Sequence, residues 1–333
     1  MKIALFSRYF NTRNGGIGVY SKNLLRELLE RGHEIDVVQT TWRSAKSYLL
    51  YTLFDLALRI PRDVEVYHAL APTESIYLPK ERAVVTFHDL IPLGEFGYKK
   101  HGIGRRLIAY HWFLFACRQG VKAKRIICNS EQTKQELIDF FSVPEEKISV
   151  IRMGINPSLK PKPKRKKDKF IVGILSYLDP RKRIDILIRA FKKVNDRDAE
   201  LWIGGDGIDR ARLERIAKGD KRIRFFGFIP DEFLVDFYNS LDVFVFPTQI
   251  EGYGLPIIEA MACKLPVITL KDAVIPFDVK SRTYVVDKKE LAKVLERREF
   301  KCDVKANYKF ARLHNWKLTA KLTEEVYRDV VEG

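Results

Sequence analysis

Cysteine is scarce in this chain of 333 residues: there are four, far apart and without a CxxC pair. This spacing gives no support to a disulfide framework or to a cysteine-ligated zinc site, and we predict no bound metal. No stretch reaches the roughly 18–20 apolar residues of a membrane-spanning helix. The apolar run within Met1–Arg8 is too short for a signal peptide. We therefore expect a cytoplasmic protein, and peripheral contact with the cytoplasmic face of the membrane stays open.

Three signature motifs are also missing. The sequence contains no HExxH, no Gly-x-Ser-x-Gly and no GxxxxGK[ST] pattern. A zinc protease, a hydrolase with a nucleophile elbow and a P-loop nucleotide hydrolase therefore lack their marks. Nor does the sequence show a recognition helix or an interleaving of aromatic and basic residues on one face, which nucleic-acid binding would need.

Positive charge is abundant. The chain has 60 Lys and Arg against 43 Asp and Glu, a net charge of +17. Such a surface attracts nucleic acid, acidic lipid head groups or phosphorylated small molecules, and the charge alone does not choose among them. Hydrophobic residues make up 46%, and the length fits two domains of roughly 150 residues each.

Short β-rich runs alternate with amphipathic stretches in both halves of the chain, which predicts parallel sheets with helices on both faces. The expected fold class is α/β, with two doubly wound Rossmann-like domains that face each other across a ligand cleft. The first half has predicted strands at 3–6, 34–39, 64–68, 83–87 and 125–128, and helices at 19–31 and 131–141. The second has strands at 170–175, 200–203, 223–227, 243–247 and 266–269, and helices at 184–195, 208–217, 232–240 and 256–262.

Pro157–Lys169 breaks this alternation with prolines and a basic run. Such a stretch marks a domain boundary. We predict an N-terminal domain at 1–158, a basic proline-rich linker at 159–169 and a C-terminal domain at 170–304. A helix over 305–333 is expected to pack back toward the N-terminal domain.

Glu251-Gly-Tyr-Gly-Leu-Pro-Ile-Ile-Glu259 is the segment most informative about function. Its two carboxylates lie eight positions apart, separated by a glycine turn and by a proline suited to the first turn of a helix. Such a turn aims backbone N–H groups and the positive end of a helix dipole at one point, where a phosphate commonly binds. Glu259, about one turn into the helix, can accept hydrogen bonds from sugar or ribose hydroxyls. The segment predicts a nucleotide-sugar site.

Two other segments suit a diphosphate. Gly15-Gly-Ile-Gly18 lies between the first strand and the first helix, where it either holds a diphosphate or is a turn that needs no ligand. Asp179-Pro-Arg-Lys-Arg183 follows the first strand of the second half. There Arg181 and Lys182 either neutralise a departing diphosphate or form an exposed basic turn.

Two features at strand ends are less specific. Gly204-Gly-Asp-Gly207 lacks the full glycine spacing of a dinucleotide loop, so a strand-to-helix turn is the safer interpretation. His88 ends a predicted strand at the edge where ligands bind in such sheets, and a structural role is its alternative.

Taken in order, these pieces resemble the retaining glycosyltransferases of the GT-B fold, in glycosyltransferase family four. The likeness is densest in the second half, where Ile223–Glu232 resembles the family's segment beside the donor base and Tyr238–Thr248 runs into Glu251–Glu259. The matching segments of the first half are Gly15–Gly18, Arg31–Glu34, Thr86–Asp89, Asn129–Glu131 and Met153–Asn156. The resemblance spans roughly residues 1–270.

The resemblance implies a donor site in the C-terminal domain and an acceptor side in the N-terminal one. Glu259 would bind the donor ribose, and Glu251 would sit beside the transferred sugar, with His88 near it. Lys182 and Arg181 would stabilise the leaving nucleoside diphosphate. The other donor-binding residues that it implies are Gly16, Gly18, Gly252, Tyr253, Gly254, Leu255 and Phe228.

The chain departs from the family at one charged position. Many members have an arginine five or six residues before the lysine, where this chain has Ser176 and Tyr177. Either Arg181 takes over that charge or diphosphate binding is weaker. Lys271–Ser281 matches no family pattern.

The implied function is metal-independent, cofactor-free transfer of a hexose, mannose or glucose first, from a nucleoside-diphosphate sugar to a hydroxyl acceptor. The expected partners are a nucleotide sugar and a saccharide or lipid-linked acceptor, with no nucleic acid. Another nucleotide-sugar enzyme such as an epimerase is the alternative, and a basic nucleic-acid-binding protein is a weaker one.

Two apolar segments bear on the acceptor. Trp42–Ile60 is rich in leucine and aromatic residues, and Arg105–Arg125 mixes aromatic and basic residues. Both are either core helices or an interfacial surface that meets an anionic membrane.

Overall fold

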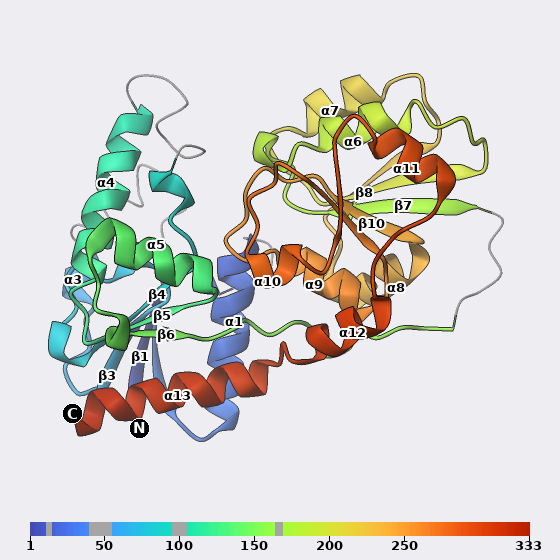
Figure 1. Ribbon diagram of the computed structural model, residues 1–333. Helices are drawn as coiled ribbons and strands as arrows, with labels where there is room; N and C mark the ends of the chain where they lie inside the picture. Colours follow the sequence, from blue (N-terminus) through green and yellow to red (C-terminus); the bar gives the residue numbers. More distant parts are fainter. Residues whose placement is uncertain (11–14, 40–54, 95–104, 164–168) are drawn as a thin grey trace. The chain divides into compact units, whose positions relative to one another are not determined.

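The computed structural model describes residues 1–10, 15–39, 55–94, 105–163 and 169–333 (Figure 1). The chain divides into two compact units. Unit 1 comprises Met1–Gly154 with His314–Gly333, and unit 2 comprises Ile155–Leu313. Residues 42–54 of the apolar segment predicted near the membrane, and residues 164–168 of the predicted linker, lie outside the described residues.

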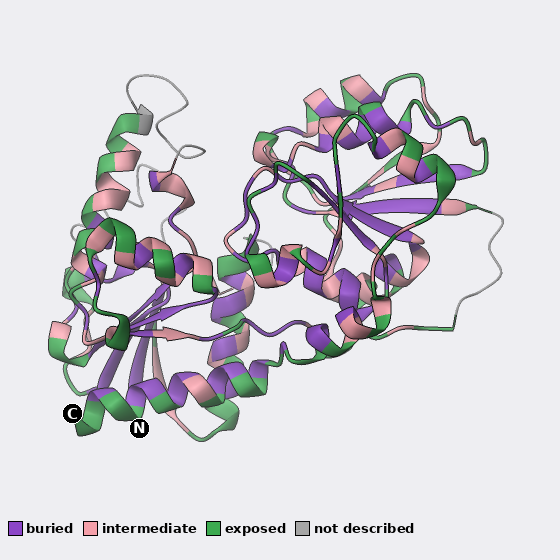
Figure 2. Cartoon of the chain, viewed as in Figure 1, coloured by how far each residue is buried: buried purple, intermediate pink, exposed green. Residues whose placement is uncertain are grey.

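Unit 1 is built on a six-stranded sheet with the strand order β2-β1-β3-β4-β5-β6, and all of these neighbours are parallel. Most of its strands are short apolar runs whose side chains are buried on both faces, as a parallel sheet covered by helices requires. Figure 2 shows these strands in the colour of buried residues. The strands are β1 (Lys2–Ser7), β2 (Glu34–Gln39), β3 (Val66–Ala69), β4 (Ala83–Phe87), β5 (Arg125–Cys128) and β6 (Ile148–Val150).

Helices flank this sheet. The α-helices described in unit 1 are α1 (Gly15–Glu30), α3 (Leu56–Leu58), α4 (Arg105–Gly120), α5 (Glu131–Phe141) and α13 (Trp316–Glu332). Ser130 caps the start of α5, since its hydroxyl accepts a hydrogen bond from the backbone N–H of Thr133 at 3.1 Å. Helix α13 packs against α1 and against β3, β4 and β5.

The predicted single helix over 305–333 is wrong: there are two helices, and they belong to different units. Helix α12 (Val304–Arg312) lies in unit 2 and α13 in unit 1. The helix restarts because Asn315 has an extended backbone and its side chain accepts a hydrogen bond from the N–H of Lys317 at 2.8 Å. An N-cap of this kind begins a new helix and cannot lie inside one.

Unit 2 has a second six-stranded parallel sheet, with the order β12-β11-β10-β7-β8-β9. Listed from the β9 edge and with β7 numbered as the first strand, this order is 3-2-1-4-5-6, that of a doubly wound dinucleotide-binding fold. Its strands are β7 (Phe170–Leu175), β8 (Ala199–Gly204), β9 (Ile223–Gly227), β10 (Val243–Phe246), β11 (Val267–Leu270) and β12 (Tyr284–Val286).

The helices of unit 2 form two layers. In Figure 1, α6, α7 and α11 group on one side of the sheet, and α8, α9 and α12 on the other. Their bounds are α6 (Ile184–Phe191), α7 (Arg210–Ala217), α8 (Asp231–Ser240), α9 (Leu255–Ala262), α10 (Phe277–Lys280) and α11 (Leu291–Arg297). The predicted α/β class with two doubly wound domains is confirmed.

One predicted turn is wrong. Gly15–Gly18 was expected to be a turn before a helix at Val19, but α1 begins at Gly15 itself, so Gly16 and Gly18 lie in its first turn. Gly15 has a left-handed φ of +74° and leads the chain into the helix. Glycine is tolerated there because the first N–H groups of a helix need no intrahelical partner.

Candidate functional site

The strand order of unit 2 places two loops together. The chain leaves β7 toward β8 and leaves β10 toward β11, so the sheet has its topological switch point between the neighbours β7 and β10. Ligands of open α/β sheets bind outside the carboxyl ends of the strands at such a point. The loops that begin there are Ser176–Arg183 and Pro247–Gly254, which carry three of the predicted catalytic residues.

The structure brings those three charged residues together. The Lys182 ammonium donates to Oε1 of Glu251 at 2.5 Å, and an Arg181 guanidinium nitrogen lies 3.8 Å from the same oxygen. The Thr248 hydroxyl also donates to this oxygen, at 2.6 Å. One carboxylate oxygen therefore meets two cations and a hydroxyl.

Burial shifts the pKa values of Lys182 and Glu251. Lys182 and Glu251 are both buried. Removal from water lowers the pKa of Lys182, against the opposing charge of Glu251. Burial alone would raise the pKa of Glu251, but the charges of Lys182 and Arg181 outweigh it and hold the pKa below its usual range. Glu251 is thus held as a carboxylate at neutral pH.

Short hydrogen bonds fix the shape of the first loop. Asp179 caps the 3₁₀ turn Pro180–Lys182, because its side chain accepts from the N–H of Arg181 at 2.9 Å. The N–H of Gln249 then donates to the carbonyl of Arg181, also at 2.9 Å, and joins the two loops by their backbones. The cap at Asp179 and the backbone bond to Gln249 therefore fix the positions of Arg181 and Lys182.

Glu259 lies on α9, one turn past the glycine segment. Gly254 has a φ of +90°, which favours glycine, and Pro256 falls in the first turn of the helix as predicted. The Tyr238 hydroxyl donates to Oε2 of Glu259 at 2.7 Å. Burial, together with the charge of Asp231, raises the pKa of Glu259 to about 7 despite this hydrogen bond. The carboxyl group therefore titrates near neutral pH.

The loops after β7 and β8 run side by side. The N–H of Leu178 donates to the carbonyl of Asp206 at 3.0 Å. Gly205 has a φ of +107°, and a Cβ there would stand 1.8 Å from the carbonyl oxygen of Ser176. Gly204–Gly207 is thus a strand-to-helix turn, as interpreted from the sequence, and its glycines allow two backbones to approach.

Three other positions of the predicted donor site lie at the same strand ends. Ser176, where an arginine was expected, is buried, and no partner of its hydroxyl is found among the described residues. Tyr177 is more than half exposed. Phe228 follows β9 and is 44% exposed.

The predicted site residues of unit 1 lie just after β4 and at the start of α1. His88 follows β4, and its Nε2 donates to the carbonyl of Leu70 at 3.0 Å, since a carbonyl can only accept. The Tyr20 ring packs edge-on against it at 4.9 Å. Burial lowers the pKa of His88 to about 4, so the ring is neutral at pH 7. Gly16 is exposed, with open space where a Cβ would stand.

Unit 1 also contains a buried polar chain that no sequence motif predicted. His68 is fully buried, and its two ring nitrogens meet the Tyr327 hydroxyl at 2.6 Å and the Thr86 hydroxyl at 2.8 Å. The Tyr20 hydroxyl lies 3.3 Å from that of Thr86. Burial lowers the pKa of His68 to about 3 and raises that of Tyr20 to about 12. These groups are neutral, and they join α1, β3, β4 and α13.

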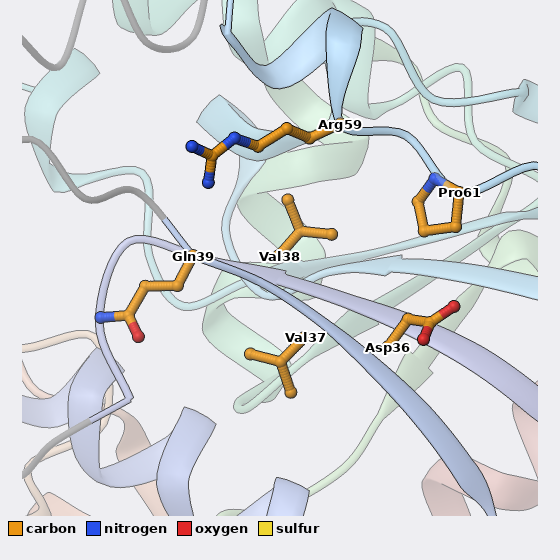
Figure 3. A pocket seen from close by; sticks show the side chains of 6 residues that line it. All are labelled: Asp36, Val37, Val38, Gln39, Arg59 and Pro61. Carbon is orange, nitrogen blue, oxygen red and sulfur yellow. The ribbon is translucent and has the colours of Figure 1, made fainter.

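A hollow of about 600 Å³ lies along the edge strand of unit 1. Figure 3 shows its walls: the end of β2 on one side, and Arg59 and Pro61 on the other. The residues that line it are Asp36, Val37, Val38, Gln39, Arg59 and Pro61. None of these is a predicted site residue, and the hollow belongs to unit 1, whereas the β7–β10 switch point belongs to unit 2.

The described part of the chain lacks two features that would bear on function. No group of three or more His, Cys, Asp or Glu side chains there is placed to hold a metal ion. Among the same residues, no helix has the length and apolar character to cross a membrane.

Comparison with known proteins identifies the class. Residues 169–297 match the family model described as Glycosyl transferases group 1, and residues 66–159 match the model described as Glycosyltransferase Family 4. Together they cover most of both units and include the switch-point loops. The fold and these two domains define a glycosyltransferase of the GT-B type. The chain belongs to the glycosyltransferases of family 4, and the predicted family is confirmed.

Individual relatives are distant. The chain is 27% identical to the O-antigen chain mannosyltransferase B of Escherichia coli over 258 residues, which cover 69% of this chain and 63% of that enzyme. Among solved structures, WaaG, a glycosyltransferase involved in lipopolysaccharide biosynthesis, superposes with a TM-score of 0.73 at 15% identity, over 99% of this chain and all of WaaG. HepE of Anabaena, solved in complex with UDP and glucose, gives 0.71 at 17% identity over 98% of both chains. These two likenesses establish the fold.

Three residues with contacts at the site were absent from the predicted set. Thr248 donates a hydrogen bond to Glu251 and Tyr238 donates one to Glu259, and Arg183 joins three loops. Thr248 could have been found from its place directly after a buried strand and Pro247. No signal in the sequence pairs Tyr238 with Glu259, because they lie on different helices.

Proposed function

We propose that this protein transfers a hexose, mannose or glucose, from a nucleoside-diphosphate sugar to a hydroxyl acceptor with retention of anomeric configuration. The observation that supports this best is the cluster of Arg181, Lys182 and Glu251 at the switch point of unit 2. Glu259, a half-buried residue, follows it on α9. Two cations suit a diphosphate, and a carboxylate suits a ribose diol.

The proposed chemistry follows from where charge develops. The bond between the anomeric carbon and the diphosphate oxygen breaks, and its electron pair stays on the diphosphate. Lys182 and Arg181, held in place before the reaction, stabilise this growing negative charge. The acceptor oxygen bonds to the carbon on the face that the diphosphate leaves, and its proton passes to the departing oxygen. Neither cofactor nor metal takes part in this proposal, since two protein cations supply the charge.

The relatives support the choice of sugar. The Escherichia coli relative is a mannosyltransferase, and the HepE structure holds UDP and glucose. Arg181 is proposed to replace the arginine missing at Ser176 and Tyr177, because its guanidinium reaches the carbonyl of Ile250 at 2.5 Å, inside the site. An epimerase is the alternative, and an assay with donor alone separates them, since an epimerase converts the sugar without an acceptor.

A donor screen tests the proposal. One of the UDP-, GDP- and ADP-sugars should raise the melting temperature most, since a ligand that binds only the folded state stabilises it by mass action. The same donor should support transfer with EDTA present throughout. Equal melting temperatures with all donors would contradict the nucleotide site, and activity lost in EDTA and restored by Mg²⁺ would contradict the metal-independent mechanism.

The exposed apolar residues of helix α4 support the proposal that the acceptor lies at a membrane surface. Leu107, Ile108 and Phe115 are 53%, 63% and 43% exposed. Positions 107, 111, 115 and 118 follow helical spacing, so these residues form one face of α4 together with exposed His111 and Arg118. Phe113, on the opposite face of α4, packs against the core of unit 1, and Ala116 and Cys117 beside it are buried. The net charge of +17 complements anionic lipid.

We therefore expect the protein to co-sediment with vesicles that contain acidic lipid. Replacing Leu107 and Ile108 together by serine should weaken this binding about 10-fold or more, since each removes a side chain worth about 1.5–3 kcal/mol when buried. Leu29→Ser is the matched control, because Leu29 is 51% exposed on α1 of the same unit, outside both apolar segments. Equal sedimentation with neutral and acidic vesicles would count against the surface.

A further inference from the structure

Arg183 adopts a backbone conformation that is unfavourable for its residue type. Its φ of +51° lies in the left-handed region, where a side chain with a Cβ crowds the backbone and glycine is favoured. Arg183 follows Lys182 directly and precedes α6. A residue held in such a conformation is retained when the surrounding contacts over-determine it, and this pattern concentrates at functional sites.

Its guanidinium joins the loops that follow three neighbouring strands. It donates to the carbonyls of Pro247 at 2.8 Å and Thr248 at 2.7 Å, both in the loop after β10. It also binds Asp272, in the loop after β11, through both carboxylate oxygens at 2.9 and 3.0 Å. Its own backbone lies in the loop after β7. The side chain therefore connects the loops after β7, β10 and β11, which are adjacent in the sheet.

These contacts close a ring around the catalytic glutamate. Arg183 binds the carbonyl of Thr248, and the hydroxyl of Thr248 donates to Oε1 of Glu251. Lys182, the residue before Arg183, donates to the same oxygen. The Arg183 guanidinium lowers the pKa of the Asp272 carboxyl group, so Asp272 stays charged and the ion pair is kept at neutral pH. A shift of Arg183 would therefore move Lys182 and Thr248, the two residues that donate hydrogen bonds to Glu251.

We propose that Arg183 is a positioning residue, which sets the geometry of Lys182, Thr248 and Glu251 by joining the loops after β7, β10 and β11. This role rests on the proposed function, because Lys182 and Glu251 are its proposed catalytic pair. Arg183 acts through them and not on the sugar. Arg183 has a left-handed backbone, and the two consecutive side chains bind different partners: Lys182 binds Glu251, and Arg183 binds Asp272.

Kinetics of Arg183→Gly test the role. Glycine relieves the backbone strain and removes the guanidinium, so kcat/KM should fall about 10–100-fold, the size of effect that a misplacement of about 1 Å produces. Asp272→Asn keeps the side-chain shape at an exposed position and should cost about 3–10-fold, which keeps the test open if the glycine variant folds poorly. Ser142→Gly is the control, because Ser142 also has a left-handed φ, of +50°, at the end of α5 in unit 1, and its kinetics should not change.

A double-variant cycle separates positioning from general stability. If Arg183 acts through Glu251, then Arg183→Gly combined with Glu251→Gln should be no slower than Glu251→Gln alone, within about twofold. Losses that multiply would overturn the proposal, as would full activity of Arg183→Gly.

Amide hydrogen exchange gives a readout that needs no activity. The N–H groups of Gln249 and Glu251 bond to Arg181 and Val274 and so join the three loops. Their exchange should accelerate in Arg183→Gly and stay unchanged in Ser142→Gly. Unchanged exchange in both would overturn the positioning role. Accelerated exchange in a protein that transfers no sugar would contradict the proposed function and support the positioning.

Discussion

Replacing Lys182 by alanine should lower kcat/KM for sugar transfer by about 10²–10³-fold, the loss that follows removal of one preorganised group from a site of developing charge. Lys182 is the cation nearest to Glu251, at 2.5 Å, whereas Arg181 lies 3.8 Å from it. Arg181 would keep part of the positive charge, so the loss should stop short of inactivity. The measurement is steady-state transfer with the donor that the melting screen selects.

The same substitution should destabilise the fold, because it leaves the buried carboxylate of Glu251 without its closest cation. Breaking a buried pair from one side costs about 3–5 kcal/mol, whereas replacing both partners by neutral groups is often harmless. Urea unfolding should therefore show Lys182→Ala destabilised and Lys182→Met with Glu251→Gln close in stability to the unchanged protein. The double variant should nevertheless lose transfer, because it lacks both proposed catalytic groups. Lys193→Ala is the control, since Lys193 is an exposed lysine at the end of α6. Transfer at the original rate in Lys182→Ala would disprove its role.

Glu259→Ala should raise the donor KM about 10–100-fold and leave kcat closer to its original value. Hydrogen bonds to a charged group contribute about 1.5–3 kcal/mol each, and the proposed contact is with the ribose, away from the bond that breaks. Tyr238 occupies Oε2 of Glu259 in the described structure. We therefore expect the ribose to bind mainly to the other oxygen. A loss confined to kcat would mean that Glu259 acts on the transferred sugar.

The raised pKa of Glu259, about 7, adds a pH dependence with a definite sign. In the unfolded chain the group titrates near 4.5, so between these values the folded state binds more protons than the unfolded state. Stability contributed by this group is therefore fully present below about 4.5 and is lost as the pH rises through 7. Ligand binding has the opposite sign, because the carboxylate form accepts the ribose hydroxyls, so donor affinity should rise over the same range.

Comparison with Glu259→Gln isolates this titration. The amide does not titrate, so the difference in melting temperature between the two proteins should change between pH 5 and 8, and donor binding at pH 7 should release protons only from the unchanged protein. Calorimetry in buffers of different ionisation enthalpy measures that release. Glu232→Gln, an exposed change on α8, should behave like the unchanged protein. Identical pH profiles for Glu259→Gln and the unchanged protein would show that another group titrates.

Much of the fold could be predicted from the sequence because its central strands are apolar runs bounded by polar or glycine residues. The ranges of β4, β5, β7 and β9 and of helix α5 were predicted without error. The strands that went unpredicted, β6 and β12, have three residues each and lie at sheet edges, where burial is partial and the apolar signal weak. The break between α12 and α13 was missed because helical periodicity continues across Asn315.

The candidate site also has a part that could be predicted from the sequence and a part that could not. Arg181, Lys182 and Glu251 were assigned to one site by the resemblance to the glycosyltransferases, and the parallel topology, which places the ends of β7 and β10 side by side, brings them together. The Tyr238–Glu259 hydrogen bond depends on how α8 lies beside α9, which no periodicity in either helix reveals. The role of Arg183 in joining the loops was missed because the residue type arginine gives no indication of a left-handed backbone.

The division of unit 1 between residues 1–154 and 314–333 has a consequence for synthesis. The buried bond from His68 to Tyr327 cannot form until α13 has left the ribosome. At about 5–20 residues per second, translation of residues 155–313 takes roughly 8–30 s. During that time the nascent N-terminal sheet lacks the helix that covers β3, β4 and β5. The unit encoded second is therefore the first that can be complete, and the growing chain must keep an uncovered apolar face from aggregation while it waits.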